Sequence, residues 1–126
     1  MANRFLNPTR ALEKELTTIV GRITINGSAA ITASSGRGWT AAKTATGEYT
    51  VTLQDKWSKL LGVAFAQLGT GTIVTTPELK SEDVAGASAH PNFVIKTVTR
   101  STGATADTAV AFDLLFTLKL RNSSVV

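Results

Sequence analysis

The chain has 126 residues, no cysteine and a formal net charge of +4. This length suits one domain with a single hydrophobic core, and the lack of cysteine excludes disulfides, thiolate metal sites and thiol chemistry. Its lysine and arginine residues are spread singly along the sequence, so we predict no direct contact with nucleic acid, which requires several basic side chains on one surface.

The beginning of the chain predicts an N-terminal arm over residues 1–11. Asn7-Pro8 interrupts regular structure there, and only Phe5 and Leu6 offer apolar anchorage before it. Whether this arm docks on a partner or is disordered stays open. No apolar run is long enough for a signal peptide or a membrane span, so we predict a cytoplasm-like compartment and no membrane association.

Residues 12–126 are predicted to form one β domain, because apolar and polar residues alternate in several short segments. Leu12 to Ile19 could begin as a helical turn, but the alternation that follows predicts a first strand from about Leu16 to Asn26. Further strands are expected at residues 29–33, 39–45, 48–54, 60–68, 93–100 and 110–120, with a possible one at 72–76. Residues 39–45 and 48–54 form the clearest hairpin, across Thr46-Gly47.

Three of these segments carry particular expectations. Residues 60–68 are almost continuously apolar, which is typical of an inner strand, with a short helix as the alternative. Residues 69–92 are predicted to be mostly irregular, because glycine and proline interrupt them; long loops of this kind are often contact surfaces. Residues 110–120 are apolar at every second position, so the last strand is the best-defined element.

The strands follow one another without amphipathic helices between them, which excludes a parallel βαβ layout. We therefore predict an all-β fold, an antiparallel β-sandwich, and within that class a jelly roll. An open small barrel is the alternative.

Few residues suggest chemistry. His90 is the only histidine and lies in the long loop without a second imidazole to share a metal. Asp107 and Asp113 flank the last turn, but hydrolysis by paired carboxylates also needs a sugar-binding cleft with aromatic platforms. Asp113 shares the outward side of the last strand with Lys119 and Arg121, where pairing with a neighbouring strand or an ordinary solvated surface are both open. We predict no enzyme activity, no metal and no cofactor.

The segment Gly36-Arg37-Gly38-Trp39, the run Thr46-Gly47-Glu48-Tyr49-Thr50-Val51-Thr52-Leu53-Gln54-Asp55 with Trp57, and Leu60-Leu61-Gly62-Val63 resemble a segment of small structural proteins of tailed bacteriophages. The similarity continues through Gly103, Asp107 and residues 112–120, so it covers about half of the chain. Within that group the chain most resembles a capsid cement or decoration protein.

The resemblance implies a jelly-roll module that binds the outer surface of the major capsid protein shell as a homodimer or homotrimer and catalyses no reaction. It implies assembly in the host cytoplasm and a final place on the exterior of the virion. The residues expected to contact the capsid are Arg4, Phe5, Leu6, Arg10, Trp39 and Trp57. From the residues alone, the two tryptophans are most simply core or sheet-edge aromatics, with anchoring at an interface as the alternative. A phage tail or fibre component, a carbohydrate-binding or carbohydrate-cleaving sandwich, and a soluble ligand-binding sandwich are the alternatives.

Overall fold

The computed structural model describes residues 16–86 and 90–121, which form eight strands and no helix. The strands are β1 (Leu16–Ile25), β2 (Ile31–Gly36), β3 (Trp39–Ala45), β4 (Glu48–Leu53), β5 (Lys59–Leu68), β6 (Thr75–Asp83), β7 (Asn92–Thr99) and β8 (Phe112–Arg121). The predicted arm, with its expected contacts Arg4, Phe5, Leu6 and Arg10, lies outside the described residues.

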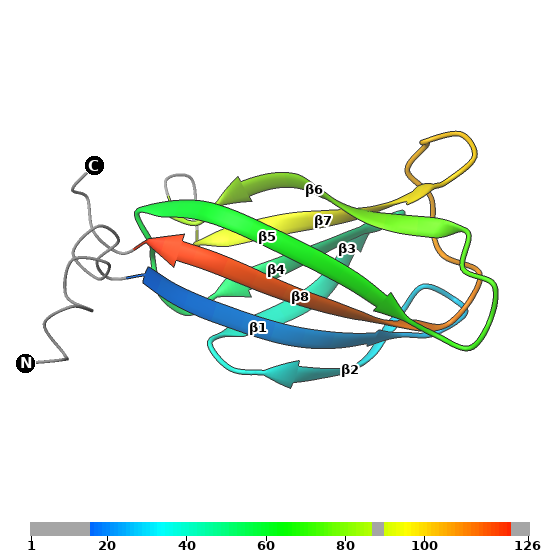
Figure 1. The fold of residues 1–126 in the computed structure, drawn as a ribbon, viewed down its shortest axis with the longest axis horizontal. Coiled ribbons are helices and arrows are strands. Elements are labelled where there is room, and N and C mark those ends of the chain that lie inside the picture. Colours follow the sequence, from blue (N-terminus) through cyan, green and yellow to red (C-terminus); the bar gives the residue numbers. More distant parts are fainter. Residues whose placement is uncertain (1–15, 87–89, 122–126) are drawn as a thin grey trace, which may run out of the picture.

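Two four-stranded sheets lie one behind the other (Figure 1). The first sheet has the order β2-β1-β8-β5 and the second has the order β3-β4-β7-β6, and every pairing is antiparallel. This arrangement confirms the predicted antiparallel β-sandwich. The jelly roll is not confirmed, because β1–β2, β3–β4 and β6–β7 are consecutive strands that pair within one sheet.

The core fills the space between the sheets and comes from the alternation seen in the sequence. On β8 the side chains at every second position from Phe112 to Leu120 are buried, and on β4 those of Tyr49, Val51 and Leu53 are buried. Three rings join the layers: Phe116 contacts Trp39 edge to face with centroids 5.0 Å apart, and Phe93 in the same manner at 5.7 Å. Edge-to-face contacts of this kind stabilise a core beyond the area they bury.

The structure corrects three of the expected elements. The second strand begins at Ile31 rather than 29, and residues 60–68 form β5, which is a strand as predicted but lies at the edge of the first sheet. Much of the stretch expected to be irregular is β6, which runs over Thr75–Asp83. Pro77 stays within β6 because β6 is an edge strand, where a residue without an N–H can face away from the ladder.

Candidate interaction surface

The outer face of the first sheet carries three of the five exposed large apolar side chains among the described residues. The inward set on β8 is buried, so Asp113, Leu115, Thr117, Lys119 and Arg121 point outward. The pairing register puts further outward residues beside them on the neighbouring strands, namely Leu16, Thr18, Val20, Arg22 and Thr24 on β1 and Lys59, Gly62, Ala64, Ala66 and Leu68 on β5. We call this surface the apolar face.

Exposed large apolar side chains are concentrated on this sheet. In the described part of the chain they are Leu16, Val20, Leu61, Leu68 and Val74. Between 42% and 56% of the surface of each residue is exposed to solvent. The first four lie on strands of the first sheet: three on the apolar face, and Leu61 in the β5 bulge opposite Lys119. Leu115, Ala64 and Ala66 lie between Val20 and Leu68, whereas Leu16 lies at the other end of β1. Isolated exposed apolar residues are ordinary, but a continuous stretch of them on one face is typical of a contact surface.

A shallow hollow on this face lies between Val20, Arg22, Leu115 and Thr117. It forms at the junction of β2, β1 and β8, next to Gly21 and Gly36, which carry no side chain. A hollow with apolar walls can take up a side chain of a partner, and buried anchors of this kind supply most of the affinity of protein interfaces.

Three charged side chains of the apolar face, those of Arg22, Asp113 and Lys119, bind neighbours on the adjacent strand. Arg22 donates to Asp113 through Nη2 and through Nε, the latter at 2.9 Å, and Lys119 Nζ donates to Thr18 Oγ1 at 2.8 Å. The hydrogen bond from Arg22, assisted by one from Thr24, lowers the pKa of Asp113 below its usual value. Of the two alternatives left open for Asp113, the structure therefore shows pairing with the neighbouring strand β1. Being exposed, this ion pair contributes little stability, but it fixes the Arg22 side chain, which borders the hollow.

The outer face of the second sheet has a different character. It carries two ion pairs, Lys80–Glu48 at 2.9 Å and Lys96–Glu78 at 3.7 Å. Threonines occupy much of the rest, and the hydroxyls of Thr44 and Thr50 lie 3.0 Å apart. Paired charges and hydroxyls on a sheet surface are typical of a face in contact with water. The two outer faces therefore differ in polarity, and the apolar face is the candidate for binding.

The two tryptophans expected to contact a partner occupy different environments. Trp39 is a core residue, 6% exposed, and its indole Nε1 donates to the Val20 carbonyl at 3.2 Å. A ring buried in this way offers no face to a partner, so we leave Trp39 out of the contact surface. Trp57 is half-buried against the core, and its Nε1 has no hydrogen-bond partner although it is shielded from water.

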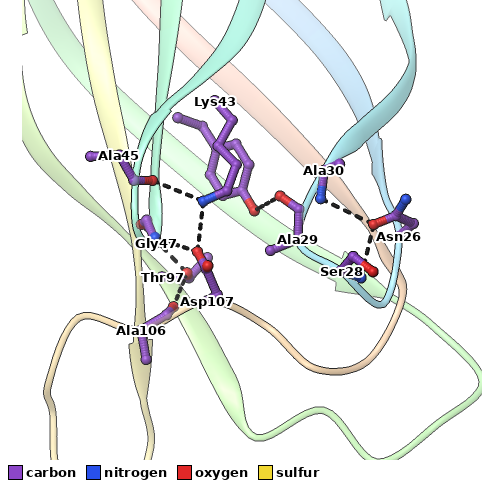
Figure 2. A network of polar contacts seen from close by, with 11 residues as sticks. Asn26, Ser28, Ala29, Ala30, Lys43, Ala45, Gly47, Thr97, Ala106 and Asp107 are labelled. Atoms are coloured by element: carbon purple, nitrogen blue, oxygen red, sulfur yellow. Dashed lines mark hydrogen bonds and ion pairs between the residues drawn. The ribbon is translucent and has the colours of Figure 1, made fainter.

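Polar contacts at one end of the sandwich join three loops (Figure 2). Asp107, which precedes β8, accepts hydrogen bonds at Oδ1 from Lys43 Nζ at 2.7 Å and from the Gly47 amide at 2.6 Å. The hydrogen bond from Lys43 is the main reason why the pKa of Asp107 lies below its usual value. Close by, the Tyr49 hydroxyl donates to the Ala29 carbonyl at 2.7 Å. These contacts fix the β3–β4 turn against the connections that precede β2 and β8.

The residues considered for catalysis are dispersed. Asp107 and Asp113 belong to separate ion pairs, with Lys43 and Arg22, and His90 is exposed. Within residues 16–86 and 90–121, no group of three or more histidine, cysteine, aspartate or glutamate side chains is arranged to hold a metal ion. The same residues include no helix long and apolar enough to cross a membrane.

Comparison with known proteins gives no match to a family model, to a curated protein or to a solved structure.

From the sequence, Asp113, Lys119 and Arg121 were correctly placed on the outward side of the last strand, but the exposed apolar residues of the face were not recognised as a surface, although a signal for them was present. In a strand with one buried side, two adjacent large apolar residues put one of them on the outside. Ile19-Val20, Leu60-Leu61 and Leu114-Leu115 are such pairs. Their outward members are Val20, Leu61 and Leu115, the last of which is partly covered by its neighbours.

Proposed function

We propose that this protein is a non-enzymatic structural component of a virion, a cement or decoration protein that binds the outer surface of the major capsid shell. The observation that carries the proposal is the polarity difference between the two outer faces of the sandwich. Four of the five exposed large apolar residues in the described part of the chain lie on the first sheet, whereas none of them lies on a strand of the second sheet. A sandwich with exposed apolar side chains on only one outer face is suited to binding a large surface with that face.

The chemistry of the apolar face defines the capsid surface that would fit it. Val20 and Leu115 border the hollow together with Arg22, and Lys119 and Arg121 follow further along β8. The chain as a whole carries a net charge of +4. The complementary surface has an apolar side chain at its centre and carboxylates around it. A copy that binds two neighbouring capsid subunits at once links them, so that two weak contacts give a much stronger overall attachment. Many such copies on one shell would stabilise it.

Replacing Val20 by glutamate is expected to reduce attachment to capsids by about tenfold or more, since it buries an unpaired charge at the centre of the contact. Val20 is 56% exposed on β1, so the fold should tolerate the change. The measurement is the amount of added protein that cosediments with shells assembled without it. The matched control is Val74→Glu: Val74 is 51% exposed but lies just before β6, away from the apolar face.

Equal binding of the two variants would contradict the role of the apolar face. Failure of the unmodified protein to bind shells at all would contradict the capsid assignment. Antibody labelling of intact virions separates the capsid from the alternative location, because a tail or fibre component would be labelled along one axis only.

A further inference from the structure

The two sheets have four edge strands, β2 and β5 in the first and β3 and β6 in the second. An exposed edge is a template for pairing with another strand, and proteins commonly block it with proline, lysine, a bulge or a short strand. β6 contains Pro77, Lys80 and a bulge between Leu79 and Ser81. β3 has Lys43 beside a register shift, and β2 is six residues long with all but its first residue exposed. Three edges are thus protected.

The fourth edge, β5, lacks such protection over most of its length. Its ten residues carry one charge, Lys59 at the start, and no proline. The only register shift lies between Leu60 and Gly62, after which the strand pairs with β8 without interruption as far as Leu68. β5 hydrogen-bonds to β8 on one side and to none of the other described strands on its free side. A long, regular and uncharged edge of this kind favours the addition of a strand.

From Val63 to Ala66 both sides of β5 are apolar, and beyond them Gln67 Oε1 accepts a hydrogen bond from Arg100 Nη2 at 3.3 Å. The outward residues Ala64 and Ala66 are exposed and small, so a second sheet can approach closely. The inward residues Val63 and Phe65 pack against the core but are only partly buried. A strand added to β5 would cover the open flank of these two side chains and remove further apolar surface from water.

We propose that a second copy of this chain adds to this edge, β5 against β5, in antiparallel orientation about a two-fold axis. The result is a continuous eight-stranded sheet with the order β2-β1-β8-β5-β5-β8-β1-β2. Self-pairing fits this strand for two reasons. Residues 60–68 carry no charge, so they do not repel the same residues of the second copy. The antiparallel orientation also puts the Lys59 residues of the two copies at opposite ends of the junction. A two-fold interface closes after two copies and leaves no free β5 edge.

The pairing does not depend on the capsid proposal. It uses the backbone of β5, whereas the capsid contact is centred on Val20 and Leu115 of β1 and β8. In a paired sheet the two apolar faces lie on the same side, so both copies could attach to one surface together. This arrangement gives the bridging of neighbouring subunits a structural basis.

The test is the oligomeric state measured by sedimentation equilibrium. The unmodified protein is expected to be a dimer, and the double change Ala64→Lys with Ala66→Lys is expected to raise the dimer dissociation constant about tenfold or more, because like charges then face each other across the junction. The matched control is Ala33→Lys, an exposed position on β2, the opposite edge of the same sheet. This control is expected to stay dimeric.

Disulfide trapping gives a second measurement that needs no change in charge. The chain has no cysteine, so Ala64→Cys, Ala66→Cys and Ala33→Cys each introduce a single thiol. Oxidation is expected to link copies through position 64 or 66, whichever lies nearer the two-fold axis, and not through position 33. A monomer at the highest soluble concentration, a trimer, or a dimer that only Ala33→Lys dissociates would each overturn the proposal. Each of these results would leave the capsid-binding measurement unaffected.

Discussion

Replacing Gly21 by alanine is expected to lower the free energy of unfolding by about 3 kcal/mol, as severe overpacking of a core does. Gly21 lies on β1 opposite Phe116 of β8 and Gly36 of β2. A β-carbon at position 21 would overlap the rings of both Phe116 and Trp39. Neither ring can move freely, because the two pack edge to face with each other and the Trp39 indole is tied to the Val20 carbonyl. Urea denaturation measures the loss.

The matched control for this change is Gly62→Ala on β5. A β-carbon there would have its nearest neighbour, Lys119 Cβ, at 4.0 Å, which is ordinary contact. Alanine also restricts the unfolded chain more than glycine does, so Gly62→Ala should be neutral or slightly stabilising. If the two variants had the same stability, the close packing of Trp39 and Phe116 beneath β1 would be wrong.

Tyr49 is expected to lose its proton only near pH 12, and the folded state is expected to lose about 3 kcal/mol of stability as it does so. Burial is the main cause of the rise in its pKa to about 12, with the negative charge of Asp107 as the second. The hydroxyl is fully buried and donates to the Ala29 carbonyl. Because the folded pKa lies above the unfolded value of 10.0, this stabilisation is complete below pH 10 and is lost as the pH rises through 12.

This titration can be followed directly, because Tyr49 is the only tyrosine in the chain. The ultraviolet absorbance of the phenolate reports its ionisation, and urea denaturation across the same pH range reports stability. Tyr49→Phe is the control: it should lose about 1.5 kcal/mol at neutral pH by leaving the Ala29 carbonyl without its donor, and should lack the additional loss above pH 10. A folded protein in which Tyr49 ionises near pH 10 would contradict the buried environment.

The fold was predictable wherever one side of a strand faces the core. β8 and β4 alternate regularly, and both were predicted as strands, β8 with its apolar side as well. β6 was missed because Pro77 and three acidic residues argue against a strand, and only its place at a sheet edge makes them acceptable. The prediction that β5 is an inner strand was wrong. An apolar run indicates burial, but whether a strand lies inside a sheet or at its edge depends on pairings between residues far apart in the sequence.

The contact surface was harder to predict than the fold. Residue type drew attention to Trp39, but a large aromatic ring is as useful to a core as to an interface, and the pairing of Gly21 with Gly36 provides the space that the ring fills. Val20 is an unremarkable residue in a β-rich sequence. It becomes significant only when the register puts it on the outer face beside Leu115 and the hollow.

The most direct test of the account is a reconstruction of shells decorated with this protein, at a resolution that distinguishes the two sheets. The account predicts that the first sheet lies against the shell, with Val20 and Leu115 at the contact and the ion pairs of Glu48 and Glu78 facing solvent. A reconstruction in which the second sheet lies against the shell, and the first faces solvent, would contradict it.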